Sequence, residues 1–287
     1  MVSGLASERE TPKTALSPFR VLLVDADPQY NLTTFVGHEE SPTMLADVLL
    51  APDKICEAIT RSRAGLADII NGSRETAAVQ DELKARHKSP YIALRRILDT
   101  VRDDYDFIFI DTARTMDLMS VSALAAADEI LVPIDCDPMA VKGLGLIRQS
   151  LQELGDAELL RTQPKIRILL TKYPGRKPTP RGVRETVEYV RSLGLSTYET
   201  VIRYSEQGRE AFPQAQTMLD LFPKSNPAQD YRQLAREFTS TLREGPLTLV
   251  ACIEKGGTMK TTTIATLGHA LTKPIVSEMI SESGVLE

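Results

Sequence analysis

The sequence predicts an α/β protein with a doubly wound, mostly parallel sheet flanked by helices. Three observations predict this fold class: short apolar runs recur along the chain, helix-length amphipathic segments separate them, and several runs end in an acidic residue or a glycine loop. Short runs rich in β-branched residues are typical of buried parallel strands. Strands that alternate with helices favour a parallel sheet covered on both faces.

The elements are expected in the following order. Strong strands are predicted at residues 19–25, 107–111, 129–134, 166–171 and 247–253, with a weaker one at 67–70. Helices are predicted at residues 91–103, 121–128, 142–154, 180–193, 227–243 and 263–271. Residues 1–19, rich in Ser, Thr, Pro and charge, predict a loose head, and residues 273–287 predict a tail. Residues 20–272 are expected to form a single domain, with its last strand–loop–helix unit at 247–272.

Composition limits the possible functions. The chain has 287 residues, of which 42% are hydrophobic and 25% charged, with a net charge of −5, as in ordinary globular proteins. Its three cysteines form no CxxC pair, which argues against a disulfide framework, a zinc ribbon or an iron–sulfur cluster. No apolar run reaches about 18 residues and no signal-peptide core opens the chain, so we expect a cytoplasmic protein.

The strongest chemical signal is the stretch EKGGTMKTT at residues 254–262, between a predicted strand and a predicted helix. In this setting backbone N–H groups and the helix N-terminus face a phosphate. Lys260 would reach the β- and γ-phosphates, and the Thr261 hydroxyl would hold Mg²⁺. The standard pattern GxxxxGK[ST] is not met, because Glu254 and Met259 stand at its glycine positions. The alternative is a plain glycine turn.

Carboxylates follow two of the predicted strands. Asp25 and Asp27 lie at the end of the first strand, and Asp111 ends the second strong strand. Ligands of open α/β sheets bind at the carboxyl ends of strands, where such acids can serve Mg²⁺ and a water molecule. For Asp27 followed by Pro28 the alternative is a helix N-cap, and from the residues alone the two interpretations are evenly matched.

Basic residues cluster late in the chain. Residues 161–209 contain eleven Lys and Arg against four Glu, a net charge of +7 in a chain of −5. This surplus indicates either a phosphate-backbone contact surface or a solvated face laced with ion pairs. The cations that we expect to contact DNA are Lys172, Arg176, Lys177, Arg203 and Arg209.

These motifs together resemble the ParA/MinD-type deviant Walker A ATPases, most closely the ParA partition ATPases. The likeness is carried by KGGTMKTTT at 255–263, VLLVDADPQYNLT at 21–33, YDFIFIDT at 105–112, ILLTKYPGR at 168–176 and FPKSNPAQDYRQLAREF at 222–238. The resemblance implies a P-loop NTPase fold of the SIMIBI type. Thr112-Ala113-Arg114 departs from the family, which usually has a Pro-Pro pair after the Walker-B acid.

The chain order also departs from the family, in which the P-loop unit comes first. Here it comes last, so the chain looks like a circular permutation of the family. This interpretation predicts that Arg20 and Leu271 lie at the same rim of the domain. It also predicts that the strand before the P-loop is central, beside residues 21–24 or 107–110.

The resemblance implies a role for each matching residue. The nucleotide would be bound by Lys255, Gly256, Gly257, Thr258, Met259, Lys260, Thr261 and Thr262. Lys255 would be the signature lysine that crosses a dimer interface to the partner's ATP. Thr261, Asp25 and Asp111 would support Mg²⁺, and Asp27 would orient the attacking water.

The function implied is slow ATP hydrolysis, with an ATP-bound homodimer that binds DNA nonspecifically on the nucleoid. A centromere-binding partner of the ParB type would stimulate hydrolysis. Two alternatives stay open: a nucleotide-gated scaffold in which Met259 has abolished hydrolysis, and a MinD-like ATPase that cycles on a membrane. The second needs a basic amphipathic terminal helix, whereas residues 273–287 are acidic.

Overall fold

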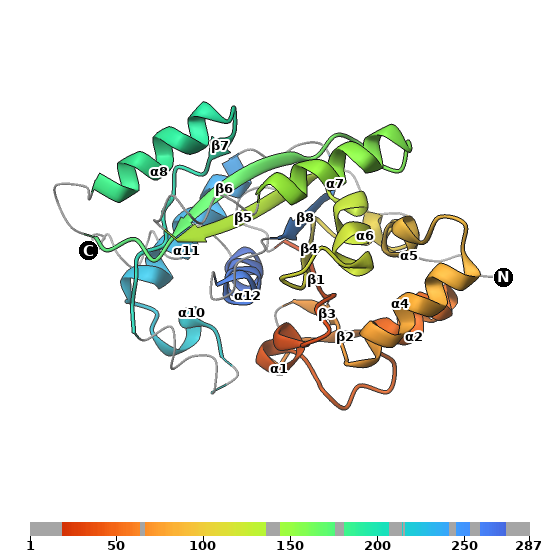
Figure 1. The fold of residues 1–287 in the computed structure, drawn as a ribbon. Coiled ribbons are helices and arrows are strands. Elements are labelled where there is room, and N and C mark those ends of the chain that lie inside the picture. Colours follow the sequence, from red (N-terminus) through yellow and green to blue (C-terminus); the bar gives the residue numbers. More distant parts are fainter. Residues whose placement is uncertain are drawn as a thin grey trace.

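The computed structural model describes residues 19–63, 67–135, 144–175, 181–206, 214, 216–240, 245–252 and 259–273. Its centre is an eight-stranded sheet with the order β2-β3-β1-β4-β8-β5-β6-β7 (Figure 1). The strands are β1 (Val21–Asp25), β2 (Ile59–Arg61), β3 (Asp68–Ile70), β4 (Phe107–Asp111), β5 (Glu129–Asp135), β6 (Lys165–Thr171), β7 (Ser196–Thr197) and β8 (Leu247–Ala251). Among these described strands only β2 runs antiparallel to its neighbour, so the mostly parallel sheet that the sequence predicts is confirmed.

Helices cover both faces of the sheet (Figure 1). On one face lie α2 (Leu45–Leu50), α4 (Glu75–Arg86), α5 (Ala93–Asp99), α6 (Leu118–Ala126) and α7 (Leu144–Asp156), and on the other α1 (Asn31–Val36), α10 (Met218–Leu221), α11 (Asn226–Ser240) and α12 (Lys260–Leu271). Short α3 (Ile55–Ala58) precedes β2, and α8 (Arg181–Ser192) precedes β7 at the sheet edge. Within the described residues, no helix has the length and apolar character that a membrane span requires.

Side chains of each central strand alternate between two apolar cores. Leu22 and Val24 of β1 enter the core under α2 to α7, whereas Val21 and Leu23 enter the core under α1, α11 and α12. This alternation follows from the two-residue period of a strand. It explains why the strands read as continuous apolar runs, since a sheet covered on both faces buries every position.

The last strand of the sequence occupies the middle of the sheet. β8 pairs with β4 on one side and β5 on the other, so the prediction of a central strand beside residues 107–110 is confirmed. Just before the amino end of β1, the Phe19 N–H donates to the Leu271 carbonyl over 3.2 Å. The first and last described segments therefore meet at one rim, as the permuted order predicts.

Several boundaries differ from the sequence prediction. The helix expected at residues 91–103 is interrupted, because α5 ends at Asp99, with the Thr100 hydroxyl bonded to the Ile97 carbonyl, and 3₁₀ turns flank it. Helix α6 begins at Leu118 because the Asp117 side chain caps it by accepting the Ser120 N–H. Of the expected head at residues 1–19 and tail at residues 273–287, only Phe19 and Lys273 are among the described residues.

Candidate functional site

Three neighbouring strands end at one place on the carboxyl edge of the sheet. Asp25, the last residue of β1, is the register partner of Asp111, the last residue of β4, and Asp111 is the partner of Ala251 in β8. The Ala26 N–H donates to the Asp111 carbonyl over 2.9 Å, which holds the two strand ends together. Residues from both halves of the chain therefore build one site.

The start of α12 faces these carboxylates. The Thr261 hydroxyl donates to Oδ2 of Asp111 over 2.6 Å. The Lys260 ammonium is buried and donates to the carbonyls of Thr112 and Ala113 over 2.9 and 2.8 Å. A lysine and a hydroxyl at a helix N-terminus, set against an acid that ends a buried strand, form an arrangement suited to a phosphate and its metal ion.

Burial makes the two strand-end acids difficult to ionise. Both carboxyl groups are fully buried. Burial, and next the neighbouring charge of Asp111, raises the pKa of Asp25 to about 8. Burial also raises the pKa of Asp111, to about 6, although the nearby Lys260 ammonium and the Thr261 hydroxyl act in the opposite direction. Like-charged carboxylates in a shared low-dielectric site call for a compensating cation.

The acids can contribute oxygen ligands to a magnesium ion. Oδ1 of Asp111 is buried and lacks a hydrogen-bond partner among the described residues, and the Thr261 hydroxyl lies beside the same carboxylate. No three His, Cys, Asp or Glu side chains in the described part of the chain form a metal cage. The Asp111 carboxylate with the neighbouring Thr261 hydroxyl fits Mg²⁺, which is usually bound by one or two carboxylates together with substrate phosphates and water.

Asp27 is buried at the rim of this site. Its carboxylate accepts the Gln29 N–H over 2.9 Å, and its carbonyl accepts the Tyr30 N–H over 2.8 Å, which closes a tight turn. The alternative of an Asp27 N-cap is wrong, because Tyr30 occupies the cap position of α1 and makes no side-chain cap bond. The turn leaves Asp27 beside Asp25, whose Oδ1 accepts the Asp27 N–H over 3.3 Å.

Met259 occupies a backbone conformation that favours glycine. Its φ of 66° and ψ of 25° place it in the left-handed helical region at the N-cap of α12. The sequence shows only a missing glycine at this position. The structure adds that the backbone there still has the glycine-like shape.

Replacing Met259 with glycine is expected to stabilise the fold by up to about 1 kcal/mol. Left-handed geometry costs an L-residue about 1–2 kcal/mol, of which the greater freedom of glycine in the unfolded chain offsets a part. The control is Ala78→Gly at an exposed position near the start of α4, which should cost about 1 kcal/mol. Urea unfolding measures both changes, and destabilisation of equal size in the two variants would contradict this account of Met259.

Part of the expected nucleotide loop is not among the described residues. Four of its residues lie outside the described part of the chain: Lys255, Gly256, Gly257 and Thr258. Thr262 is described and is half-buried in the first turn of α12. Among the described residues, the structure brings five of the predicted site residues together: Asp25, Asp27, Asp111, Lys260 and Thr261.

The basic segment is rich in ion pairs. Lys172 contacts Asp135 over 3.0 Å, and Arg203 makes a forked contact with Asp230 whose shortest distance is 2.6 Å. Arg167 and Arg181 also contact glutamates. These pairs agree with the alternative of a solvated, paired face. The other expected DNA contacts, Arg176, Lys177 and Arg209, lie outside the described residues.

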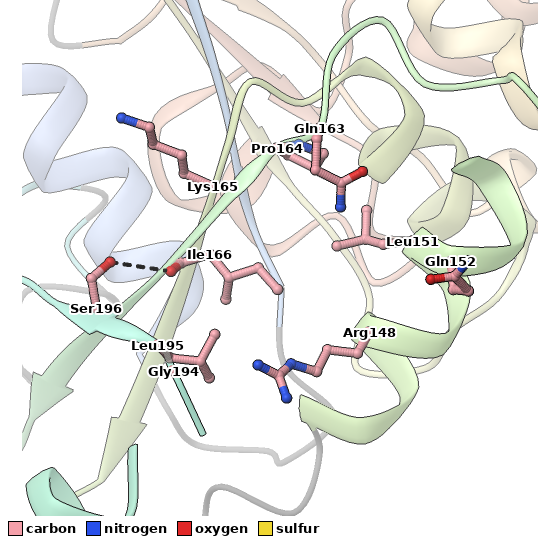
Figure 2. Close-up of a pocket in the computed structure, with 10 residues that line it drawn as sticks. All are labelled: Arg148, Leu151, Gln152, Gln163, Pro164, Lys165, Ile166, Gly194, Leu195 and Ser196. Atoms are coloured by element: carbon pink, nitrogen blue, oxygen red, sulfur yellow. Dashed lines mark hydrogen bonds between the residues drawn. The ribbon is translucent and has the colours of Figure 1, made fainter. Parts of the chain in front are cut away.

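A separate groove of about 500 Å³ lies between α7 and the β6–β7 edge (Figure 2). It is lined by Arg148 and Leu151 of α7, Ile166 of β6, and Leu195 just before β7. Ile166 and Leu195 lie at the amino ends of their parallel strands, whereas Asp25 lies at the carboxyl end of β1. The groove is therefore distinct from the carboxylate site.

Sequence reasoning missed two residues that hold Asp25 in place. Thr33 in α1 donates to the Asp25 carboxylate, and Gly72, just after β3, donates its N–H to the Thr33 hydroxyl. Thr33 lies within the stretch that carries the family resemblance, but its contact with Asp25 depends on the turn between β1 and α1. Gly72 follows the weakest of the predicted strands.

Comparison with known proteins identifies the family. A family profile described as an AAA domain matches residues 13–168, more than half of the chain. An uncharacterized protein of Mycobacterium tuberculosis is 31% identical over 224 residues, which cover 76% of this chain and 68% of that protein. The chromosome partitioning protein ParA of Caulobacter vibrioides is 29% identical, covering 78% of this chain and 84% of that protein. The chain belongs to the ParA/MinD family of P-loop ATPases.

The fold is also that of a solved structure. An ATP complex of McdA from Cyanothece superposes with a TM-score of 0.66 at 18% identity, and the match covers 77% of this chain and 85% of that one. The fold class predicted from the sequence is therefore confirmed.

Proposed function

We propose that this chain binds ATP with Mg²⁺ at the carboxyl ends of β1, β4 and β8 and hydrolyses it slowly to ADP and phosphate. The observation that carries the proposal is the contact of the Thr261 hydroxyl with Asp111, beside Lys260 and across from Asp25. These groups come from three elements far apart in the sequence. Their convergence supports one shared task better than three separate structural roles.

Each residue has a distinct part in this proposal. Lys260 binds the β- and γ-phosphates, and Thr261, Asp25 and Asp111 hold the metal ion. Mg²⁺, when bound, neutralises charge on the phosphate oxygens. Asp27 orients the attacking water, and Lys255 reaches across a dimer interface to the partner's ATP. Positioning and charge neutralisation supply most of the rate in such reactions.

The cellular role that we propose is positioning or partitioning of DNA, in line with the similarity to the chromosome partitioning protein ParA of Caulobacter vibrioides. An ATP-dependent homodimer would bind DNA nonspecifically, and a centromere-binding protein of the ParB type would stimulate hydrolysis. The surplus of +7 between residues 161 and 209 supports a DNA contact. Because carboxylates hold Lys172 and Arg203, the contact would depend on other cations of the segment and on the second face that a dimer adds.

We also infer that the chain is a circular permutation of the family order. Two placements support this inference: β8 lies between β4 and β5, and Phe19 meets Leu271 at one rim. Cutting the connection between α12, which ends at Leu271, and β1, and joining α11 to β8, would change the chain order while leaving the site intact.

Asp27→Ala is expected to leave ATP binding within a fewfold of the parent and to lower turnover at least a hundredfold. The reason is that Asp27 lies at the rim of the site and would act on the water rather than on the phosphates. Phosphate release, measured with and without duplex DNA, reports turnover, and light scattering with a slowly hydrolysed ATP analogue reports dimer formation.

The outcomes separate the competing functions. Turnover by the parent chain that disappears in Asp27→Ala supports the ATPase. ATP binding without turnover in the parent favours a nucleotide-gated scaffold, which the strained Met259 backbone at the P-loop also favours. Parental turnover in Asp27→Ala would remove Asp27 from the water-positioning role.

A further inference from the structure

The Asp25 carboxylate is held through one of its two oxygens. Oδ2 accepts the Thr33 backbone N–H over 2.7 Å and the Thr33 hydroxyl over 2.8 Å. The other oxygen, Oδ1, accepts only a longer bond of 3.3 Å, from the Asp27 N–H, among the contacts described. Because both bonds from Thr33 go to Oδ2, they leave Oδ1 as the oxygen of Asp25 that is available to a further ligand.

The direction of the Thr33 hydroxyl is determined by its second partner. The Gly72 N–H donates to Oγ1 of Thr33 over 2.7 Å. A hydroxyl has a single proton to donate, and a backbone N–H can only donate. Oγ1 therefore accepts from Gly72 and directs its own proton at Asp25. Thr33 and Asp25 are both fully buried, so water does not compete for these bonds.

Glycine at position 72 brings this donor close to the strand end. A Cβ built on Gly72 would lie 2.6 Å from the Asp25 carbonyl oxygen and 2.9 Å from its Cγ. Those distances are too short for any side chain, so the backbone can pass here only as glycine. The segment after β3 is thus pressed against the end of β1, and its N–H reaches Thr33.

We propose that Thr33 is a positioning residue for the metal site: it holds the Asp25 carboxylate so that Oδ1 faces the cation, and Gly72 holds Thr33. The inference rests on the proposed function, because it takes Asp25 as a group that supports Mg²⁺. It adds a residue to the site that does not touch the nucleotide or the metal. Thr33 acts through Asp25 alone.

The test compares three variants with the parent chain. Thr33→Val removes the hydroxyl and keeps the branched shape, Thr33→Ser keeps the hydroxyl, and Thr34→Val makes the same chemical change at the next position, which is half-buried. Mn²⁺ binding in the presence of a slowly hydrolysed ATP analogue is measured by electron paramagnetic resonance. Binding of the same analogue without metal is measured by calorimetry.

We expect Thr33→Val to weaken Mn²⁺ binding about tenfold, the size of one hydrogen bond to a charged group. Its affinity for the metal-free analogue should stay parental, because Thr33 does not contact the phosphates. Thr33→Ser and Thr34→Val should bind Mn²⁺ as the parent does. A purely structural role of Thr33 would instead weaken both measurements together.

Two results would overturn the assignment of Thr33: parental Mn²⁺ binding in Thr33→Val, or a tenfold loss in Thr33→Ser. The serine variant keeps the assignment of Thr33 falsifiable even if Thr33→Val does not fold, since it keeps the hydroxyl and loses one methyl group. Failure of the parent chain to bind the analogue with Mn²⁺ would overturn the proposed function as well. The two failures are therefore distinguishable.

Discussion

Lys260→Ala is expected to lower the affinity for ATP about a hundredfold or more. The Lys260 ammonium is buried and lies next to the Asp111 carboxylate. Lys260 is also the first residue of α12, the helix that faces the strand ends. Removing one partner of a buried charge pair costs about 2–5 kcal/mol, which corresponds to about 30- to several-thousandfold in a binding constant. The negative charge of the phosphates would then face two buried carboxylates without this cation.

The matched control is Lys84→Ala, which removes an exposed lysine from α4. Calorimetry with a slowly hydrolysed ATP analogue measures both variants, and circular dichroism verifies that each is folded. Lys84→Ala should bind as the parent does. An affinity of Lys260→Ala within threefold of the parent would mean that phosphate does not meet this lysine, and the site would have to be reassigned.

The central strands were predictable because burial on both faces leaves a local signal. Residues 107–111 and 129–134 are apolar runs of strand length, and both are strands in the structure. The edge strand β2 has no such signal, since its positions are half-buried or exposed and it pairs antiparallel with β3. Its formation depends on the neighbour rather than on its own three residues.

Parts of the site could be predicted, and others depend on the tertiary structure. Asp25 and Asp111 end strands and Lys260 opens a helix, so their places along the chain already indicate a common edge. The contact between Thr33 and Gly72 joins a residue of α1 to one in the loop after β3, and no spacing rule connects them. The pairing of Arg203 with Asp230 is a second contact of this kind. Asp230 lies outside residues 161–209, so a charge count over that segment does not include it.

The second large effect concerns pH. Without nucleotide and metal, the parent chain is expected to lose stability as the pH rises from about 5 to 8. The pKa of Asp25 is about 8 and that of Asp111 about 6 in the folded chain, against an ordinary value of 3.8. The folded state therefore binds more protons than the unfolded state across this range. Raising the pH favours the state with fewer protons, which is the unfolded one.

The size of the effect follows from the same relation. One extra bound proton changes the free energy of unfolding by about 1.4 kcal/mol per pH unit at most. Asp25 contributes up to its pKa of about 8, whereas Asp111 contributes only up to about pH 6. Between pH 6 and 8 we therefore expect a loss of about 2 kcal/mol, or several degrees in Tm.

Asp25→Asn is expected to remove most of this loss and to raise Tm at pH 8 by several degrees above the parent. An asparagine carries no charge to bury, and its side-chain oxygen can still accept the two bonds from Thr33. At pH 5.5, where Asp25 is already protonated, the two chains should be nearly equal in Tm. Calorimetry in EDTA from pH 5.5 to 8.5 measures the difference, with Asp53→Asn as the exposed control.

A gain in stability at position 25 should be accompanied by a loss of metal binding. If Asp25 is kept as a buried acid because it supports Mg²⁺, then the metal with an ATP analogue should flatten the pH dependence of Tm in the parent. The pH dependence of Tm in Asp25→Asn should stay nearly unchanged. The cation would offset the carboxylate charge that burial disfavours. Equal stabilisation of both chains by the metal and the analogue would show that Asp25 is not part of the metal site, and an unchanged pH slope in Asp25→Asn would assign the proton uptake to another group.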